Sequence, residues 1–343
     1  MSARTALVLT SINAPNRAMA ALARGAADAG FDFFVVGDTR SPADFRMDGC
    51  QFLDVAAQAA TGLRTAAACP TGHYARKNVG YLTAIRAGAA VIVETDDDNH
   101  PRPAFFDRRS RRAVAAVASG CGWLNAYRYF TNATIWPRGL PLDAVNAPIE
   151  PFAALPSREL DCPIQQGLAD EDPDVDAIYR LLLPLPQRFR TDRRLGVGRG
   201  AWCPFNSQNT SWWPEAYALM YLPAYCSFRM TDIWRSFVAQ RIAWENGWSV
   251  LFRAATVRQR RNPHDLLRDF RDEVPGYLAN REICAALQEL ELEPGGPMIA
   301  SNMRRSYELL TARGWVDPKE LLLLDAWLAD IASIGIGTEK AVG

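Results

Sequence analysis

The segment ARKNVGYLTAIRAGAAVIVETDDDN (residues 75–99) indicates the fold class of this 343-residue chain. Its first part, residues 75–88, has the pattern of an amphipathic helix that ends at a glycine. Residues 89–95 then form an apolar run typical of a buried strand. A helix that leads directly into a buried strand predicts β-α-β units and a mostly parallel sheet.

The N-terminal part of the chain repeats this alternation. We predict a strand over residues 5–11, a helix over 14–30 and a second strand over 31–38. The polar residues that follow the three predicted strands are Ser11-Ile12-Asn13, Asp38-Thr39-Arg40 and Asp96-Asp97-Asp98-Asn99. Because ligands bind beyond the carboxyl ends of parallel strands, we expect these residues to meet at one rim of the sheet.

The rest of the chain gives a less regular pattern. Residues 135–200 are rich in proline and turn residues, with a helix predicted over 174–183, and DRRLGVGRGAW (192–202) is interpreted as a flexible loop. From residue 264 onward the sequence is typical of helices. We therefore predict an α/β catalytic domain over residues 1–263 and a C-terminal helical extension over 264–343.

Composition narrows the classes of function. Lys plus Arg and Asp plus Glu both number 38, a balance that disfavours a nucleic-acid partner. The seven cysteines form no CxxC pair, which disfavours a disulfide framework or a zinc site. No apolar run is long enough to span a membrane, so we expect a soluble, cytoplasmic protein.

Three adjacent aspartates at the end of a predicted strand need an explanation, because neighbouring carboxylates repel one another. Asp96 and Asp98 have the spacing to bind a hard divalent cation, Mn²⁺ or Mg²⁺, together with phosphate oxygens. The alternative is a solvated acidic turn that ends the strand with Asn99 and Pro101. At this position in a parallel sheet we favour the metal site.

Several blocks of the sequence resemble the STELLO glycosyltransferase-like family. These blocks are ARKNVGYLTAIRAGAAVIVETDDDN (75–99), EDPDVDAIYRL (171–181), PFNSQNT (204–210), DIWRSFVAQR (232–241) and QRRNPHDLLRDF (259–270). More distantly, the DDD motif and a later Asp-x-Trp segment are similar to the reversibly glycosylated polypeptides, or UDP-arabinopyranose mutases. Unlike the plant STELLO members, this sequence shows no membrane anchor, which argues against a Golgi-type role.

The resemblance implies an A-type glycosyltransferase fold, with a mostly parallel central sheet flanked by helices and a C-terminal helical appendix. It implies metal-dependent transfer of a hexose or pentose from a nucleotide-diphosphate sugar, UDP-linked, to a glycan or another hydroxyl acceptor. One alternative is a nucleotide-sugar mutase, and another is a non-catalytic scaffold for polysaccharide synthesis. The sugar, the acceptor, the stereochemistry and the oligomeric state, a homo-oligomer included, stay open.

The resemblance also assigns a donor-binding role to residues of four segments. These residues are Ser11, Asn13, Arg17, Asp38, Arg76, Lys77, Asn78, Asp97 and Asn206. Asn13 is alternatively the N-cap of the first helix. The three residues from Arg76 begin a predicted helix whose N-terminus suits a diphosphate, and their alternative is a solvated basic turn. Asp97 is counted among the residues that bind the nucleotide sugar, but no specific role is assigned to it.

An inverting transfer needs a carboxylate that accepts the proton of the acceptor hydroxyl. Asp232 resembles the base of A-type enzymes, and its alternative is a helix N-cap. Glu171 and Asp172 are the reserve candidates. The resemblance further implies a late metal ligand, for which His264 is proposed and Gln259 competes.

Overall fold

A computed structural model describes residues 4–335 of the chain. Within that range, thirteen strands are β1 (Thr5–Thr10), β2 (Asp32–Val36), β3 (Gln51–Leu53), β4 (Val91–Thr95), β5 (Asn99–Pro101), β6 (Arg112–Ala118), β7 (Gly122–Trp123), β8 (Ser157–Asp161), β9 (Ile164–Glu171), β10 (Arg194–Val197), β11 (Ala201–Trp202), β12 (Asn209–Trp212) and β13 (Val250–Gln259). The helices of the same range are α1 (Arg17–Ala29), α2 (Val55–Ala60), α3 (Arg64–Ala68), α4 (Lys77–Arg86), α5 (Ala177–Leu182), α6 (Thr231–Glu245), α7 (Leu266–Glu289), α8 (Ile299–Ala312) and α9 (Glu320–Ile334).

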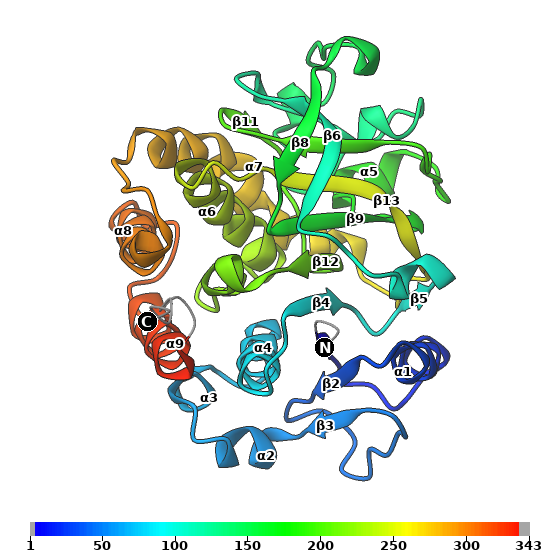
Figure 1. The fold of residues 1–343 in the computed structure, drawn as a ribbon, viewed down its shortest axis with the longest axis vertical. Coiled ribbons are helices and arrows are strands. Elements are labelled where there is room, and N and C mark those ends of the chain that lie inside the picture. The colour runs from blue at the N-terminus through cyan, green and yellow to red at the C-terminus, as the bar shows by residue number, and fades with distance from the viewer. Residues whose placement is uncertain (1–3, 336–343) are drawn as a thin grey trace, which may run out of the picture.

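Eleven of the described strands form one sheet in the order β3-β2-β1-β4-β12-β9-β13-β10-β6-β8, with β5 paired to β13 (Figure 1). Strands β3, β2, β1 and β4 are all parallel, and so are the pairs β9–β13 and β10–β6. Helices lie on both faces of the sheet. The predicted fold class, an α/β fold with a mostly parallel central sheet and C-terminal helices, is confirmed.

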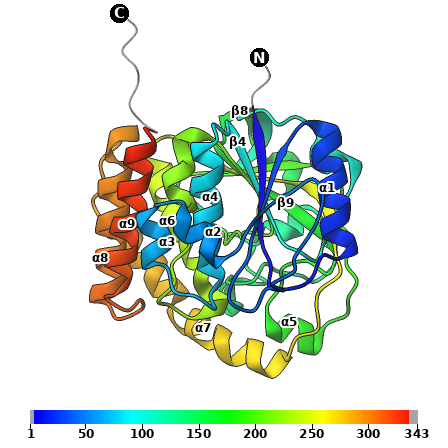
Figure 2. The same ribbon diagram turned by 90° about the horizontal axis from the view of Figure 1, so that it is seen from below.

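The alternation of side chains along β1 explains how helices cover both faces. Leu7 and Leu9 belong to the apolar cluster that contains the buried side of α1, whereas Ala6 and Val8 belong to the cluster that contains α4 and α6. All four side chains are fully buried. Figure 2 shows α1 on one side of the sheet and α4 and α6 on the other. A strand buried on both faces reads as a continuous apolar run, which is why the sequence predicted it.

The interpretation of residues 192–202 as a flexible loop is wrong. Residues Arg194–Val197 form β10, which pairs with β6 and β13 inside the sheet. Gly196 leaves room for the side chain of Leu160 there, because a Cβ atom at this position would lie 2.2 Å from Cδ1 of Leu160. Gly196 therefore lies within a strand, although in the sequence the glycines of this segment suggested a turn.

The C-terminal helices pack against N-terminal elements. The carboxylate of Asp330 on α9 accepts hydrogen bonds from the backbone N–H groups of Arg64 and Thr65, at the start of α3. Helices α8 and α9 lie next to each other along one side of the molecule (Figure 1). The division of the chain at residues 263 and 264 stays a prediction, and residues 336–343 of the proposed extension lie outside the described range. Among the helices of residues 4–335, none has the length and apolar character needed to cross a bilayer.

Candidate functional site

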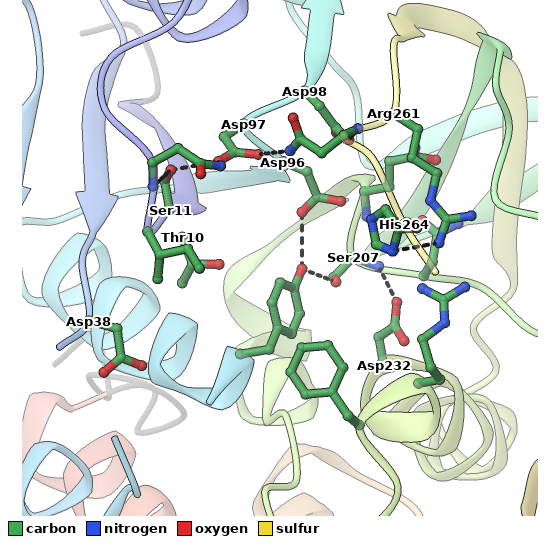
Figure 3. A pocket seen from close by; sticks show the side chains of 18 of the residues that line it. Thr10, Ser11, Asp38, Asp96, Asp97, Asp98, Ser207, Asp232, Arg261 and His264 are labelled. Atoms are coloured by element: carbon green, nitrogen blue, oxygen red, sulfur yellow. Dashed lines mark hydrogen bonds between the residues drawn. The ribbon is translucent and has the colours of Figure 1, made fainter. Parts of the chain in front are cut away.

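A pocket of about 550 Å³ lies at the carboxyl ends of β1, β2 and β4 (Figure 3). The residues predicted from the sequence that line it are Ser11, Asn13, Asp38, Arg76, Asp96, Asp97, Asp98, Asn206, Asp232 and His264. The predicted convergence of the three polar strand ends is therefore present in the structure. Asp38 lies across the pocket from Arg261 and His264 (Figure 3).

Asp97 joins the loop after β1 to the end of β4. Its Oδ2 accepts hydrogen bonds from Oγ of Ser11 at 2.5 Å and from Nδ2 of Asn13 at 2.8 Å. Its backbone oxygen accepts a bond from Asn16, the residue that caps α1, and its Oδ1 accepts one from Asn262. Neutral donors thus surround Asp97, and the N-cap of α1 is Asn16 rather than Asn13.

Asp98 is held by weaker contacts than its neighbour. Both of its carboxylate oxygens lie 3.2 Å from Nε2 of Gln259, and Oδ2 lies 3.3 Å from the backbone N of Asn262. Burial and the nearby charges of Asp96 and Asp97 raise the pKa of Asp98 to about 7, although the hydrogen bonds oppose this shift. Asp98 is therefore a carboxylate without a compensating cation from the described part of the chain.

Asp96 has a cationic partner. The buried ammonium of Lys77, at the start of α4, lies 3.2 Å from Oδ1 of Asp96 and also donates to backbone oxygens of Thr95 and Ser207. Oδ1 of Asp96 also accepts a bond from the hydroxyl of Tyr74, in the 3-10 helix η1 (Tyr74–Arg76). Burial raises the pKa of Asp96, and the charge of Lys77 opposes that rise. Lys77 thus acts on the site through Asp96 without lining the pocket.

The donor set at the end of β4 fits a hard divalent cation in part. Asp96 and Asp98 offer carboxylate oxygens, the ligands that Mg²⁺ and Mn²⁺ prefer, and burial together with the neighbouring carboxylates raises the pKa of Asp98 to about 7. No group of three His, Cys, Asp or Glu side chains within residues 4–335 is arranged to hold a metal. His264 lines the pocket, but its Nδ1 lies 3.2 Å from Nη2 of Arg261 and 3.4 Å from Oδ2 of Asp269. Its role as a metal ligand stays a prediction.

Asp232 is bound to a residue that the sequence did not single out. Arg138 lies between Asp174 and Asp232 and forms ion pairs with both, at 2.8 Å and 2.9 Å. Oδ2 of Asp232 also accepts a bond from the backbone N of Ser207. Asp232 lies in the first turn of α6, whose N-cap is Met230, so the alternative interpretation of Asp232 as the N-cap is wrong.

Other predicted residues lie outside the pocket lining. Arg17 is exposed at the start of α1, and the amide of Asn78 exchanges two hydrogen bonds with the backbone of Leu222. Glu171 forms long ion pairs with exposed arginines, and Asp172 pairs with Arg180. The side chain of Asn78 is therefore used within the protein and does not line the pocket where the diphosphate was predicted. Neither of the two reserve candidates for the base, Glu171 and Asp172, lines the pocket.

The guanidinium of Arg76 also has partners within the chain. It donates to Oε1 of Gln58 at 2.6 Å and to the backbone oxygen of Cys69 at 2.8 Å. Although Arg76 borders the pocket, its side chain is buried and joins α4 to the preceding helices. Its predicted contact with a diphosphate would require the loss of these bonds.

Sequence patterns offered little signal for the remaining wall of the pocket. Arg138 stands alone between prolines, and Tyr74 precedes the RKN motif without belonging to it. Asp174 lies in EDPDVD, a block that the resemblance marked, but its role depends on Arg138, which is 36 positions away. Only the folded chain brings these residues together.

The sequence model of the STELLO glycosyltransferases matches residues 229–343, which include Asp232, His264 and helices α6 to α9. The resemblance predicted from the sequence motifs is confirmed. The chain is STELLO-like.

Two curated relatives of the STELLO-like chain come from Arabidopsis thaliana. "Probable glycosyltransferase STELLO2" is 29% identical over 252 residues, and "Probable glycosyltransferase STELLO1" is 28% identical over 249 residues. The alignments cover 67% and 64% of this chain, but 32% and 31% of the relatives. The STELLO-like chain therefore spans about a third of the length of the curated relatives that it matches.

Proposed function

We propose that the chain is a metal-dependent glycosyltransferase that transfers a sugar from a nucleotide-diphosphate donor, UDP-linked, to a hydroxyl acceptor such as a glycan. One observation carries the proposal. The ends of β1, β2 and β4 bring Ser11, Asp38 and the three aspartates into one pocket of about 550 Å³. A pocket of this size suits a small organic ligand, and the STELLO likeness supports a sugar donor.

The nucleoside is proposed to bind at the ends of β1 and β2. Hydrogen bonds to Asp97 fix the orientation of the Ser11 and Asn13 side chains. The other hydrogen-bonding groups of these two residues are therefore already oriented before a ligand binds. Asp38 accepts bonds from the backbone N–H groups of Gly72 and His73, which positions the loop before η1. These contacts support a preorganised wall for the base and ribose.

The diphosphate is proposed to lie beside Asp96 and Asp98. These two carboxylates would hold Mn²⁺ or Mg²⁺ together with phosphate oxygens and water. The cation would neutralise the diphosphate and stabilise it as a leaving group. Lys77 keeps Asp96 in a fixed position, because its buried ammonium also bonds to the backbone on both sides.

Asp232 is the proposed base for the acceptor hydroxyl. It lines the same pocket, at the start of α6, and Arg138 fixes its orientation. Its oxygens already accept three hydrogen bonds from Arg138 and one from the backbone of Ser207. An acceptor hydroxyl must therefore share or displace one of these bonds before Asp232 can take its proton.

The proposal is tested by thermal shifts with UDP-, GDP- and ADP-linked sugars, each with and without Mn²⁺. We expect UDP-sugars to raise the melting temperature only when Mn²⁺ is present, and Asp98→Asn to remove this effect. Asp28→Asn, which changes an exposed carboxylate on α1, serves as the matched control. Equal shifts for all the nucleotides, or none for any, would contradict the proposal.

The hydrogen bonds that occupy Asp232 favour a second candidate, a nucleotide-sugar mutase. Interconversion of ring forms needs no separate acceptor hydroxyl and thus no base directed at one. Product analysis with donor alone distinguishes the two functions. A ring isomer formed from the donor alone would indicate a mutase. A donor that stays unchanged on its own, and is consumed only when a hydroxyl acceptor is added, would indicate a transferase.

A further inference from the structure

One aromatic ring in the pocket lining is open to solvent. Phe228 belongs to the 3-10 helix η7 (Phe228–Met230), which directly precedes α6, and it is 52% exposed. Of the ten large hydrophobic residues that are exposed within residues 4–335, only Phe228 and Ile12 line the pocket. Single apolar residues on an outer surface need no explanation, but apolar residues inside a pocket usually contact its ligand.

Two neighbouring rings hold Phe228 in place. Its ring centroid lies 5.5 Å from that of His73 and 6.4 Å from that of Tyr74, each at an interplanar angle of 72°. Aromatic side chains prefer such edge-to-face contacts. About half of Phe228 nevertheless stays open. The ring is therefore oriented before a ligand binds, and it offers that ligand an apolar surface.

Tyr74 places this ring between the proposed cation site and the proposed base. The hydroxyl of Tyr74 donates to Oδ1 of Asp96 at 3.1 Å and shares a hydrogen bond with Oγ of Ser207. The backbone N of Ser207 in turn donates to Oδ2 of Asp232 at 3.3 Å. Figure 3 shows Ser207 between Asp96 and Asp232. Because the ring of Phe228 packs against the ring of Tyr74, it lies beside the span that joins these two carboxylates.

Gln208 lines the same pocket with an unused amide. It directly follows Ser207 and is only 5% exposed. Its backbone N–H donates to Oδ1 of Asn206, and its backbone oxygen accepts a bond from Nδ2 of Asn99. Its side-chain amide, in contrast, has no hydrogen-bond partner among residues 4–335. A buried amide without a partner is costly, so this group indicates a bond to a ligand of the pocket.

We propose that Phe228 and Gln208 form the subsite for the transferred sugar. This inference rests on the proposed function, in which the anomeric carbon lies between the diphosphate beside Asp96 and the hydroxyl that Asp232 deprotonates. A pyranose has an apolar face of C–H groups and hydroxyl groups around its edge. The face of an aromatic ring carries partial negative charge and attracts polarised C–H groups, so Phe228 packs on the sugar face. The amide of Gln208 can both donate to and accept from a sugar hydroxyl.

Calorimetric titration with Mn²⁺ tests the subsite by comparing UDP with UDP-glucose, UDP-galactose and UDP-xylose. We expect Phe228→Ala to weaken the binding of the tightest UDP-sugar about tenfold and to change UDP binding by less than about twofold. Phe228→Tyr, which keeps the ring, should bind that UDP-sugar like the wild type. Gln208→Met should weaken the UDP-sugar by about three- to tenfold, again without an effect on UDP.

The variants should keep the melting temperature of the wild type, because Phe228 is half open and the amide of Gln208 bonds to none of residues 4–335. Phe270→Ala and Gln51→Met are the matched controls. Phe270 is 37% exposed beside Tyr277, Gln51 is exposed on β3, and neither lines the pocket. Both controls should bind UDP and the UDP-sugars like the wild type.

An equal loss of affinity for UDP and for the UDP-sugar would overturn the inference, because Phe228 and Gln208 would then act on the nucleotide. Unchanged affinity for the UDP-sugar in both variants would overturn it as well. The proposed function can be judged separately. A wild type that binds no UDP-linked ligand contradicts both proposals, whereas metal-dependent binding of UDP-sugars that needs neither Phe228 nor Gln208 contradicts only the subsite.

Discussion

The buried ammonium of Lys77 lies 3.2 Å from Oδ1 of Asp96. This ion pair divides the three adjacent aspartates into three different environments. Asp96 has a fixed cation, Asp97 has a shell of neutral donors, and Asp98 has only hydrogen bonds of 3.2 Å or longer. The negative charge that a bound cation would neutralise therefore lies mainly at Asp98.

Lys77→Met should destabilise the fold and disturb the site. Removal of one partner of a buried ion pair leaves an uncompensated charge, which costs about 3 kcal/mol. The free energy of unfolding, measured by urea denaturation, should fall by this amount. The double variant Lys77→Met/Asp96→Asn should recover part of the loss, since the stranded charge is gone. An equal free energy of unfolding for Lys77→Met and the wild type would show that this ion pair does not stabilise the fold.

Cation binding should depend on the protonation of Asp98. Its pKa is raised to about 7, so the carboxyl group is ionised above neutral pH and protonated below it. A cation competes with that proton, so the affinity for Mn²⁺ should fall about tenfold per pH unit as the pH drops from 6.5 towards 5. Titration of Mn²⁺ in the presence of UDP measures the slope. An affinity that does not change over this range would exclude Asp98 as a ligand.

The elements that build the rim could be predicted from the sequence because local pattern and final burial agree there. Strands β1 and β4 are continuous apolar runs and are buried on both faces, and the glycine after α1 ends that helix in the left-handed conformation. At β10 the local sequence pattern and the final burial disagree. Gly196 has the local pattern of a turn, but it leaves room for Leu160 of β8, which lies 36 positions earlier in the chain.

Glu320 should make stability depend on pH far from the pocket. Burial raises its pKa to about 7, although Tyr221 and the backbone N–H groups of Ala224 and Tyr225 donate to it. Because the folded state binds this proton more tightly than the unfolded state, the associated stability is present below about pH 4.5 and is lost as the pH rises through 7. The loss amounts to about 3 kcal/mol.

Glu320→Gln isolates this effect. The neutral amide can offer its oxygen to the two backbone donors and its NH₂ group to the hydroxyl of Tyr221. Urea denaturation between pH 5 and 8 should therefore show a smaller decline for the variant than for the wild type. Parallel curves for the two proteins would contradict the assignment of this proton to Glu320.

Asp232→Asn should separate chemistry from donor binding. An asparagine keeps one of the two oxygens that accept hydrogen bonds from Arg138 and Ser207, but it cannot accept a proton. Transfer of the sugar should slow by about 10²- to 10⁴-fold in kcat. The affinity for the UDP-sugar, measured by calorimetry, should change little. A kcat equal to that of the wild type would remove Asp232 from the role of base.

Prediction of the site was limited by the distance between its parts along the chain. The residues that follow β1, β2 and β4 were found because parallel strands place their carboxyl ends together. Arg138 and Asp174 come from irregular segments and Asp232 from the first turn of α6, and no periodic pattern relates the three. Lys77 and Asn78 belong to one motif, yet the turn of the helix directs Lys77 to Asp96 and Asn78 to Leu222.

Calorimetric titration of UDP in the presence of Mn²⁺ tests the central claim, that Asp98 holds a cation on a nucleotide diphosphate. The wild type should bind UDP with Mn²⁺ and lose most of that affinity when the metal is removed. Asp98→Asn should bind UDP weakly and with no response to Mn²⁺, while Asp28→Asn should behave like the wild type. Undiminished, metal-dependent binding of UDP by Asp98→Asn would contradict the account.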